Sequence, residues 1–142
     1  MSEFFIRPGM CFWGALGENG TEHLHIILAN VPGSQPLLCA VSVSSNNTKN
    51  SRMFDDSCIL NAGDHPAIHH SSFVVYAKTH AVSPAVLQDL LHRRRLRQSA
   101  ALDLSVFHRV LEGALKSRRI REIYKGPVLA ESERVAQQLG HD

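Results

Sequence analysis

The sequence predicts an α+β protein in which a small β-rich part, residues 1–82, is followed by an α-helical part, residues 83–142. Up to residue 82, short apolar runs alternate with turn signals without a helical period, which is typical of a small barrel or sandwich. From Ser83 onward, apolar residues recur at spacings of three and four, as on one face of a helix. We expect one domain overall, because 142 residues form a single core of ordinary size.

Five short strands are expected in the first part, because each run is rich in residues that suit a pleated, packed surface. They cover residues 10–13, 23–31, 37–44, 58–60 and 73–76. Pro32-Gly33 marks one turn between them, and Gly63 and Pro66 mark another.

The helical part begins at Ser83-Pro84, which places a capping serine before a proline in the first helical position. This first helix is expected to continue through the arginines up to Arg97. A second helix, with the clearest apolar stripe, is expected from Asp103 to Ser117. A short helical face through Ile120 should end at Gly126-Pro127, and residues 132–139 form a candidate last helix.

Composition and charge restrict the class of protein. No apolar run approaches the roughly twenty residues that a membrane span requires, and residues 1–8 lack the pattern of a signal peptide. Three cysteines in apolar contexts indicate reduced core thiols, so we expect a cytoplasmic protein. Residues 1–82 hold four basic and six acidic side chains, whereas residues 83–142 hold eleven basic and seven acidic ones. The basic part could meet an anionic partner.

Histidines suggest where chemistry could occur. His23 and His25 lie two apart on a predicted strand and so share a face, and His65, His69 and His70 follow Asp64 in a predicted loop. Two histidines of one strand and a third from a loop can bind zinc, although no fixed-spacing zinc motif is present. Without a metal, histidines can serve as acid and base in RNA cleavage by the RNA's own 2′-hydroxyl. Taken singly, each histidine is expected to be a surface or hydrogen-bonded side chain.

A cluster of arginines forms a second candidate site. Arg93, Arg94, Arg95 and Arg97 are expected on one helix, where successive residues are about 100° apart, so they cannot all grip one phosphate track. At least one of them is predicted to point toward the barrel or a neighbouring subunit and to pair with an acid such as Asp89, which lies four residues before Arg93. The other arginines are candidates for binding RNA, and the alternative is a solvated helix surface.

Several segments of residues 8–82 together resemble one family. They are the opening run Pro8-Gly9-Met10-Cys11-Phe12-Trp13, the segments His23–Leu28 and Ala40–Ser45, and the later His70–Val74. In this order they are similar to the PemK/MazF-like toxins, small SH3-like barrels that cleave RNA in toxin–antitoxin pairs. The resemblance implies an SH3-like barrel with Ser44 at the position of a family threonine. The sequence departs from the family at the second strand. In the family this strand usually begins with Arg-Pro, whereas here no arginine lies between residues 8 and 51.

These observations predict a toxin-type endoribonuclease that cleaves RNA without a metal or other cofactor. His25 and His65 are the expected acid and base, and Ser44 is expected to contact the scissile phosphate. RNA and an antitoxin protein are the expected partners. The wide apolar stripe of residues 103–117 predicts a homodimer. Two alternatives remain: a metal-dependent hydrolase using His23, His25 and His65, and a non-catalytic module that binds nucleic acid or protein.

Overall fold

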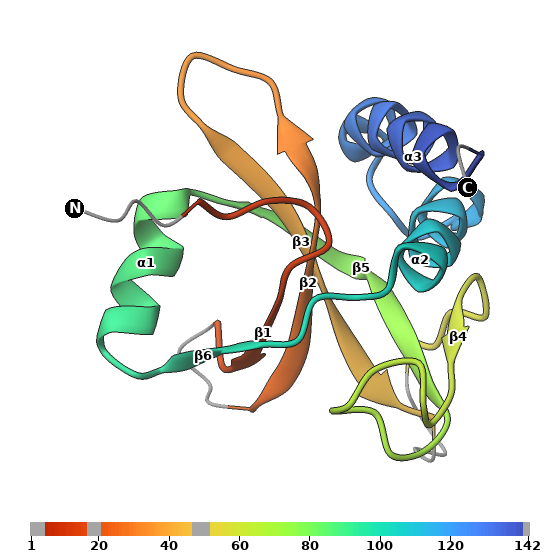
Figure 1. Cartoon of the computed structure of the whole chain (residues 1–142), viewed down its shortest axis with the longest axis horizontal. Helices are drawn as coiled ribbons and strands as arrows, with labels where there is room; N and C mark the ends of the chain where they lie inside the picture. The colour runs from red at the N-terminus through yellow and green to blue at the C-terminus, as the bar shows by residue number, and fades with distance from the viewer. Residues whose placement is uncertain (1–4, 17–20, 47–51, 141–142) are drawn as a thin grey trace.

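The computed structural model describes residues 5–16, 21–46 and 52–140, and its centre is a curled antiparallel sheet that forms half of a barrel (Figure 1). The strand order is β4-β5-β3-β2-β1-β6. The strands are β1 (Cys11–Gly14), β2 (His23–Val31), β3 (Leu37–Ser45), β4 (Ile59–Leu60), β5 (Ser72–Val82) and β6 (Leu96–Ser99). The helices are α1 (Pro84–His92), α2 (Leu104–Lys116), a short 3₁₀ turn η1 (Glu122–Tyr124) and α3 (Lys125–Gly140). The predicted α+β class and the five predicted strands are confirmed.

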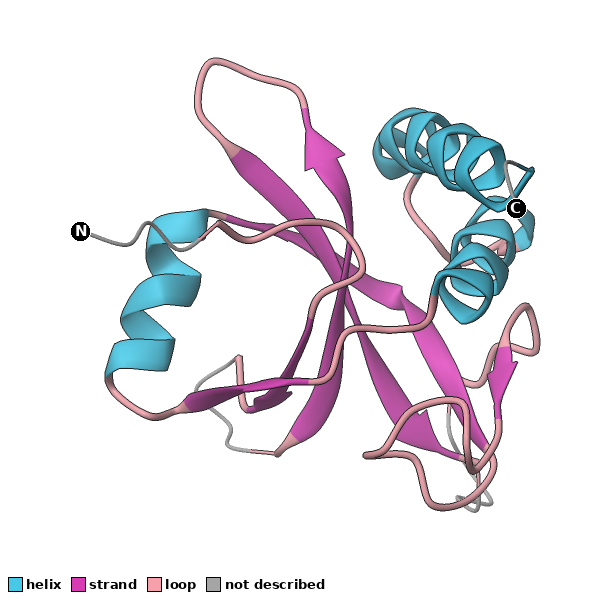
Figure 2. Cartoon of the chain, viewed as in Figure 1, coloured by secondary structure: helices cyan, strands magenta, loops and turns pink. Residues whose placement is uncertain are grey.

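Helices cover both faces of the sheet. Figure 2 shows α2 and α3 together on one side and α1 apart from them on the other. Leu24 and Ile26 of β2 belong to the core that α2 and α3 close, whereas Ile27 packs in a second core with Leu87 of α1. Both faces of β2 are therefore buried, and its centre, Ile26–Ala29, is a continuous apolar run instead of an alternating one.

Helix α2 matches its prediction, with Asp103 and Ser117 as the flanking caps. Its apolar stripe packs against the sheet and against α3 within the same chain. At Gly113 the helix approaches β5 so closely that an added Cβ would lie 2.5 Å from the Tyr76 hydroxyl oxygen. Since α3 and the sheet cover the stripe, it no longer supplies an argument for a dimer.

Helix α1 is shorter than predicted. Ser83 caps it as expected, since its Oγ accepts a hydrogen bond from the Val86 N–H at 3.1 Å. The helix ends in a Schellman motif, in which the N–H of Arg95 donates to Leu90 O and that of Arg94 donates to Leu91 O. Arg94 takes the left-handed conformation, with φ of 62°, at a position where glycine is usual. The prediction that the arginines share one helix is therefore wrong.

The chain then returns to the sheet as β6, which pairs with β1 in antiparallel fashion. Strand β6 lies at one edge of the sheet, and β5 lies next to the other edge, so α1 connects the two ends of the curl (Figure 1). Gly14 permits this pairing, because it has φ of 146° and an added Cβ would lie 2.3 Å from Arg95 O. The sequence had predicted that residues 83–142 are α-helical, but this segment also contains the strand β6.

The C-terminal segment also differs from its prediction. Gly126 and Pro127 do not end a helix but lie in the first turn of α3. Proline is tolerated there because the first N–H groups of a helix have no partner within the helix. Helix α3 then continues to Gly140 and docks through Val128 and Val135.

Two compositional predictions are tested by the structure. The three cysteines are free and buried, as expected. Among the residues that the structure describes, no helix is long and apolar enough to cross a membrane.

Candidate functional site

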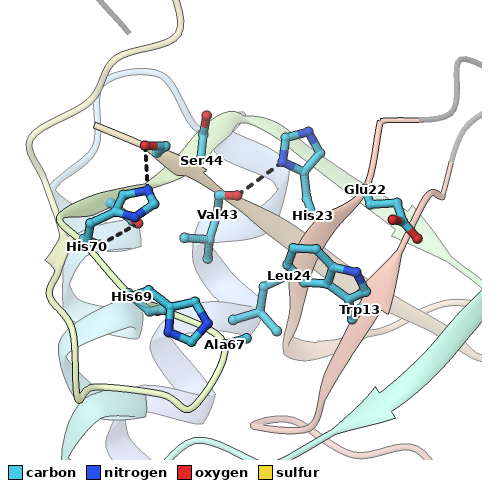
Figure 3. A pocket seen from close by; sticks show the side chains of 12 residues that line it. Trp13, Glu22, His23, Leu24, Val43, Ser44, Ala67, His69 and His70 are labelled. Atoms are coloured by element: carbon cyan, nitrogen blue, oxygen red, sulfur yellow. Dashed lines mark hydrogen bonds between the residues drawn. The ribbon is translucent and has the colours of Figure 1, made fainter. Parts of the chain in front are cut away.

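A pocket of about 300 Å³ lies between one end of β1, β2 and β3 and the loop of residues 61–71 (Figure 3). Its polar lining comes from segments far apart in the sequence: Glu22, His23, Ser44, Ser45, His69 and His70. Strand β2 supplies His23, β3 supplies both serines, and the loop supplies the other two histidines. The fold thus gathers histidines and hydroxyls that no single sequence motif contains.

The floor of the pocket is a row of side chains across the sheet. Trp13 of β1 lies opposite Leu24 of β2, and Leu24 lies opposite Val43 of β3. Directly opposed residues of antiparallel strands project from the same face, so these three side chains form a continuous apolar surface. Leu24 and Val43 are core residues, and Trp13 packs against that core while remaining partly exposed. The floor is therefore rigid.

His65 fastens the loop to the segment that follows β6. Its Nδ1 accepts a hydrogen bond from the Ala67 N–H at 2.9 Å, so the ring proton lies on Nε2. Nε2 donates that proton to Ala100 O at 2.6 Å. Both ring nitrogens of this buried histidine are thus engaged with backbone. His65 acts on the pocket by holding the loop and does not line it.

Asp64 fastens the same loop to α2. Its carboxylate accepts the Asn61 N–H at 2.8 Å and pairs with Arg109, whose Nη1 lies 3.3 Å from Oδ1. Burial alone would raise the pKa of Asp64, but the Asn61 hydrogen bond and the Arg109 guanidinium outweigh it and lower the pKa. The carboxylate is therefore charged at neutral pH, and the loop is held at two points.

His25 of β2 is buried and does not line the pocket. Its Nε2 donates to Gly14 O at 2.8 Å, and its buried Nδ1 has no hydrogen-bond partner among the described residues. Burial lowers the pKa of His25 to about 4, opposed by the Gly14 hydrogen bond and assisted by His23 and His80. The ring is neutral at pH 7 and closed off from a ligand in the pocket.

The structure thus separates the three residues predicted as catalytic. Ser44 lines the pocket, whereas His25 and His65 are buried outside it. In their place the pocket presents His23, His69 and His70. The sequence signal for these three was the same histidine clustering, but it did not indicate which rings face outward.

The three histidines that line the pocket differ in their hydrogen bonds. His23 Nδ1 lies 3.2 Å from Val43 O, and since a carbonyl only accepts, Nδ1 carries the proton and Nε2 keeps a lone pair. His70 Nε2 lies 2.7 Å from Ser45 Oγ. His69 is exposed, and its ring makes no hydrogen bond or ion pair with other residues in the described ranges. In Figure 3, His23 and His69 lie on opposite sides of the Leu24–Val43 floor.

The four arginines of the second candidate site have separate positions. Arg93 pairs with Asp89 as predicted, with Nε 3.1 Å from Oδ2. Arg94 and Arg95 are exposed in the turn after α1. Arg97, on β6, lies opposite Trp13 and lines a second hollow beside the pocket. Only Arg97 is therefore adjacent to the histidines.

The metal-site alternative required His23, His25 and His65 to converge. In the part of the chain that the structure describes, no group of three His, Cys, Asp or Glu side chains is placed to hold a metal ion. The three histidines instead contact different backbone carbonyls, those of Val43, Gly14 and Ala100.

No family model matches the chain, and no curated protein matches it. The residues of the pocket are therefore the basis for assigning a function.

Proposed function

We propose that this protein is an endoribonuclease that cleaves RNA at the pocket without a metal ion. The observation that supports this proposal is that His23, His69 and His70 open onto one pocket together with Ser44 and Ser45. Two proton-transferring groups and hydroxyl donors are the groups that transesterification by a 2′-hydroxyl needs. The proposal keeps the reaction expected from the sequence and assigns it to different histidines.

The reaction uses the two histidines on opposite sides of the floor. His23 Nε2 accepts the proton of the RNA 2′-hydroxyl, because its Nδ1 proton is held by Val43 O. The 2′-oxygen then forms a bond to phosphorus as the bond from phosphorus to the 5′-oxygen breaks, and a protonated His69 gives its proton to that leaving oxygen. The products are a 2′,3′-cyclic phosphate and a 5′-hydroxyl. Ser44, Ser45 and His70 are placed to donate hydrogen bonds to the phosphate oxygens.

Charge around the pocket is compatible with an anionic polymer that enters from one side. Glu22 is the acid among the lining residues and lies beyond Trp13 and His23 at the rim in Figure 3. Arg97 lies in the adjoining hollow and supplies a positive charge there. It stands in for the arginine that the second strand lacks.

The test is cleavage of a mixed-sequence RNA pool in the presence of EDTA, with analysis of the product ends. We expect 2′,3′-cyclic phosphate and 5′-hydroxyl termini from the native chain. Replacing His23 with Ala or His69 with Ala should each reduce the rate by about 10²- to 10⁴-fold, the usual contribution of a positioned acid or base.

His92→Ala is the matched control, because His92 is exposed at the end of α1 and lines none of the described pockets. This variant should retain the native rate. An inactive native chain, activity abolished by EDTA, or activity that survives both His23→Ala and His69→Ala would each refute the proposal.

We extend the proposal to a toxin that an antitoxin protein neutralises, on the resemblance of residues 8–82 to the PemK/MazF-like toxins. Expression of the native chain should then arrest growth, whereas the His23→Ala variant should not. Co-expression of an antitoxin encoded beside it should restore growth. Normal growth on expression of the active native enzyme would contradict the toxin role and leave the ribonuclease assignment to its own test.

A further inference from the structure

A second hollow, of about 520 Å³, adjoins the catalytic pocket on the side of β6. It is lined by Trp13, Ala67, His69, Arg97, Gln98 and Ser99. The first three of these also line the catalytic pocket, so Trp13 and His69 form a shared wall. A chain-like ligand bound in the pocket can therefore continue directly into the second hollow.

The pairing of β1 with β6 fixes which side chains meet in this hollow. Arg97 lies directly opposite Trp13, so the guanidinium stem and the indole project from the same face of the sheet. Ser99 lies two residues further along β6 and shares that face. The indole itself is held by its packing on the core next to Leu24.

Arg97 differs from the other basic side chains near the site in what it contacts. Arg93 is paired with Asp89, and Arg109 is paired with Asp64. The Arg97 side chain is exposed and makes no ion pair or hydrogen bond with any residue that the structure describes. Its charge is therefore available to a ligand.

We propose that this hollow binds one unpaired nucleotide of the substrate, with the base stacked on Trp13 and its phosphate held by Arg97. An indole face stacks on any base, with a contribution of about 1–3 kcal/mol per base. A guanidinium can form two parallel hydrogen bonds to a phosphate. Stacking on aromatic side chains is the usual mode by which proteins bind the splayed bases of single-stranded RNA. This inference rests on the proposed function for the identity of the polymer as RNA.

Trp13 is the single tryptophan of the chain, so its fluorescence reports on the wall that this hollow shares with the catalytic pocket. The probe is a 2′-O-methyl RNA trinucleotide, which lacks the attacking hydroxyl and cannot be cleaved. We expect the trinucleotide to quench the fluorescence in a saturable manner. Ribose 5-phosphate and inorganic phosphate should not quench it, because they have no base to stack. If ribose 5-phosphate or inorganic phosphate quenches the fluorescence as the trinucleotide does, the hollow binds an anion without stacking a base, and the proposal is overturned.

Replacing Arg97 with Gln should weaken trinucleotide binding by about tenfold and flatten its salt dependence by roughly one unit of slope for one lost phosphate contact. Arg95→Gln is the matched control, because Arg95 is exposed just before β6 and lines neither hollow. Its affinity should equal that of the native chain. Equal weakening in both variants, or in neither, would refute the assignment to Arg97.

Binding of a fluorescein-labelled trinucleotide, followed by anisotropy, tests the indole independently. Trp13→Phe keeps an aromatic face and should bind more tightly than Trp13→Leu, whereas equal binding would refute stacking. Neither measurement depends on cleavage. Quenching without RNA cleavage would refute the ribonuclease assignment and support the nucleotide subsite. Cleavage without quenching would support the ribonuclease assignment and refute the nucleotide subsite.

Discussion

Acidification should destabilise this protein in a pH range that His25 sets. The buried ring is neutral, its Nε2–H donates a hydrogen bond to Gly14 O, and burial lowers its pKa to about 4 from the ordinary 6.5. The unfolded chain therefore binds a proton more readily than the folded chain over this interval. The stabilising effect of the neutral ring is complete above about pH 6.5 and is lost as the pH falls toward 4.

The size of the effect follows from these two pKa values. Linkage predicts that the free energy of unfolding decreases by about 2 kcal/mol between pH 7 and pH 5, and by about 3 kcal/mol between pH 7 and pH 4. Asp55 and Asp64 contribute little between pH 7 and pH 5, because the unfolded chain protonates an aspartate only near the ordinary pKa of 3.8; since their pKa values are lower in the folded chain, they add to the loss of stability at more acidic pH.

Urea unfolding at a series of pH values measures this difference, with His25→Gln as the comparison. The glutamine amide can still donate to Gly14 O but does not titrate. Its free energy of unfolding should decrease by about 2 kcal/mol less than that of the native chain between pH 7 and pH 5. Parallel pH profiles for the two proteins would show that His25 is not protonated on unfolding in this range, and would refute the reasoning.

Two further substitutions test the packing. Gly113→Ala should lower the free energy of unfolding by about 1–3 kcal/mol, because the new Cβ would lie 2.7 Å from Cys58 Cβ and 2.9 Å from Ser57 O; Gly126→Ala, with nothing within 4 Å, should not lower it. Arg94→Gly should raise the free energy of unfolding by about 1 kcal/mol, because glycine adopts a φ of 62° without strain, and a decrease would contradict the Schellman end of α1. Urea unfolding at pH 7 measures both effects.

The elements that the sequence predicted well are those whose signals are local. Strand β2 was predicted with its observed bounds because an apolar run, Ile26–Ala29, lies at its centre and turn-forming residues flank it on both sides. Helix α2 was predicted from its apolar stripe, since residues of one helix face recur at fixed spacing. The cap at Ser83 needed only the Ser-Pro pair.

The elements that were missed depend on partners distant in the sequence. Strand β6 has only four residues, two of them exposed, and its pairing with β1 decides its conformation. The end of α1 was not predicted because the residue in the left-handed conformation there is Arg94, whereas a glycine at this position would have indicated a helix end. Gly14 permits the close approach of β6, but nothing in the sequence identified the strand that approaches it.

The histidines show how far composition can locate a site. The clustering of histidines pointed to β2 and to the loop of residues 61–71, and residues of both line the pocket. His65 and His69 are four residues apart in that loop, yet one is buried and the other exposed. The difference arises from the Ala100 carbonyl, which is 35 residues away and accepts a hydrogen bond from the His65 Nε2–H. No local pattern encodes that contact.

The hydrogen bonds of the histidines also determine which of them can exchange a proton with a ligand. A ring whose two nitrogens are both bonded to backbone, like that of His65, cannot exchange a proton with a ligand unless the loop first detaches. His25 cannot do so either, because one nitrogen is bonded to Gly14 O and the other is enclosed. In the proposed reaction, proton transfer therefore falls to His23, His69 and His70, which line the pocket.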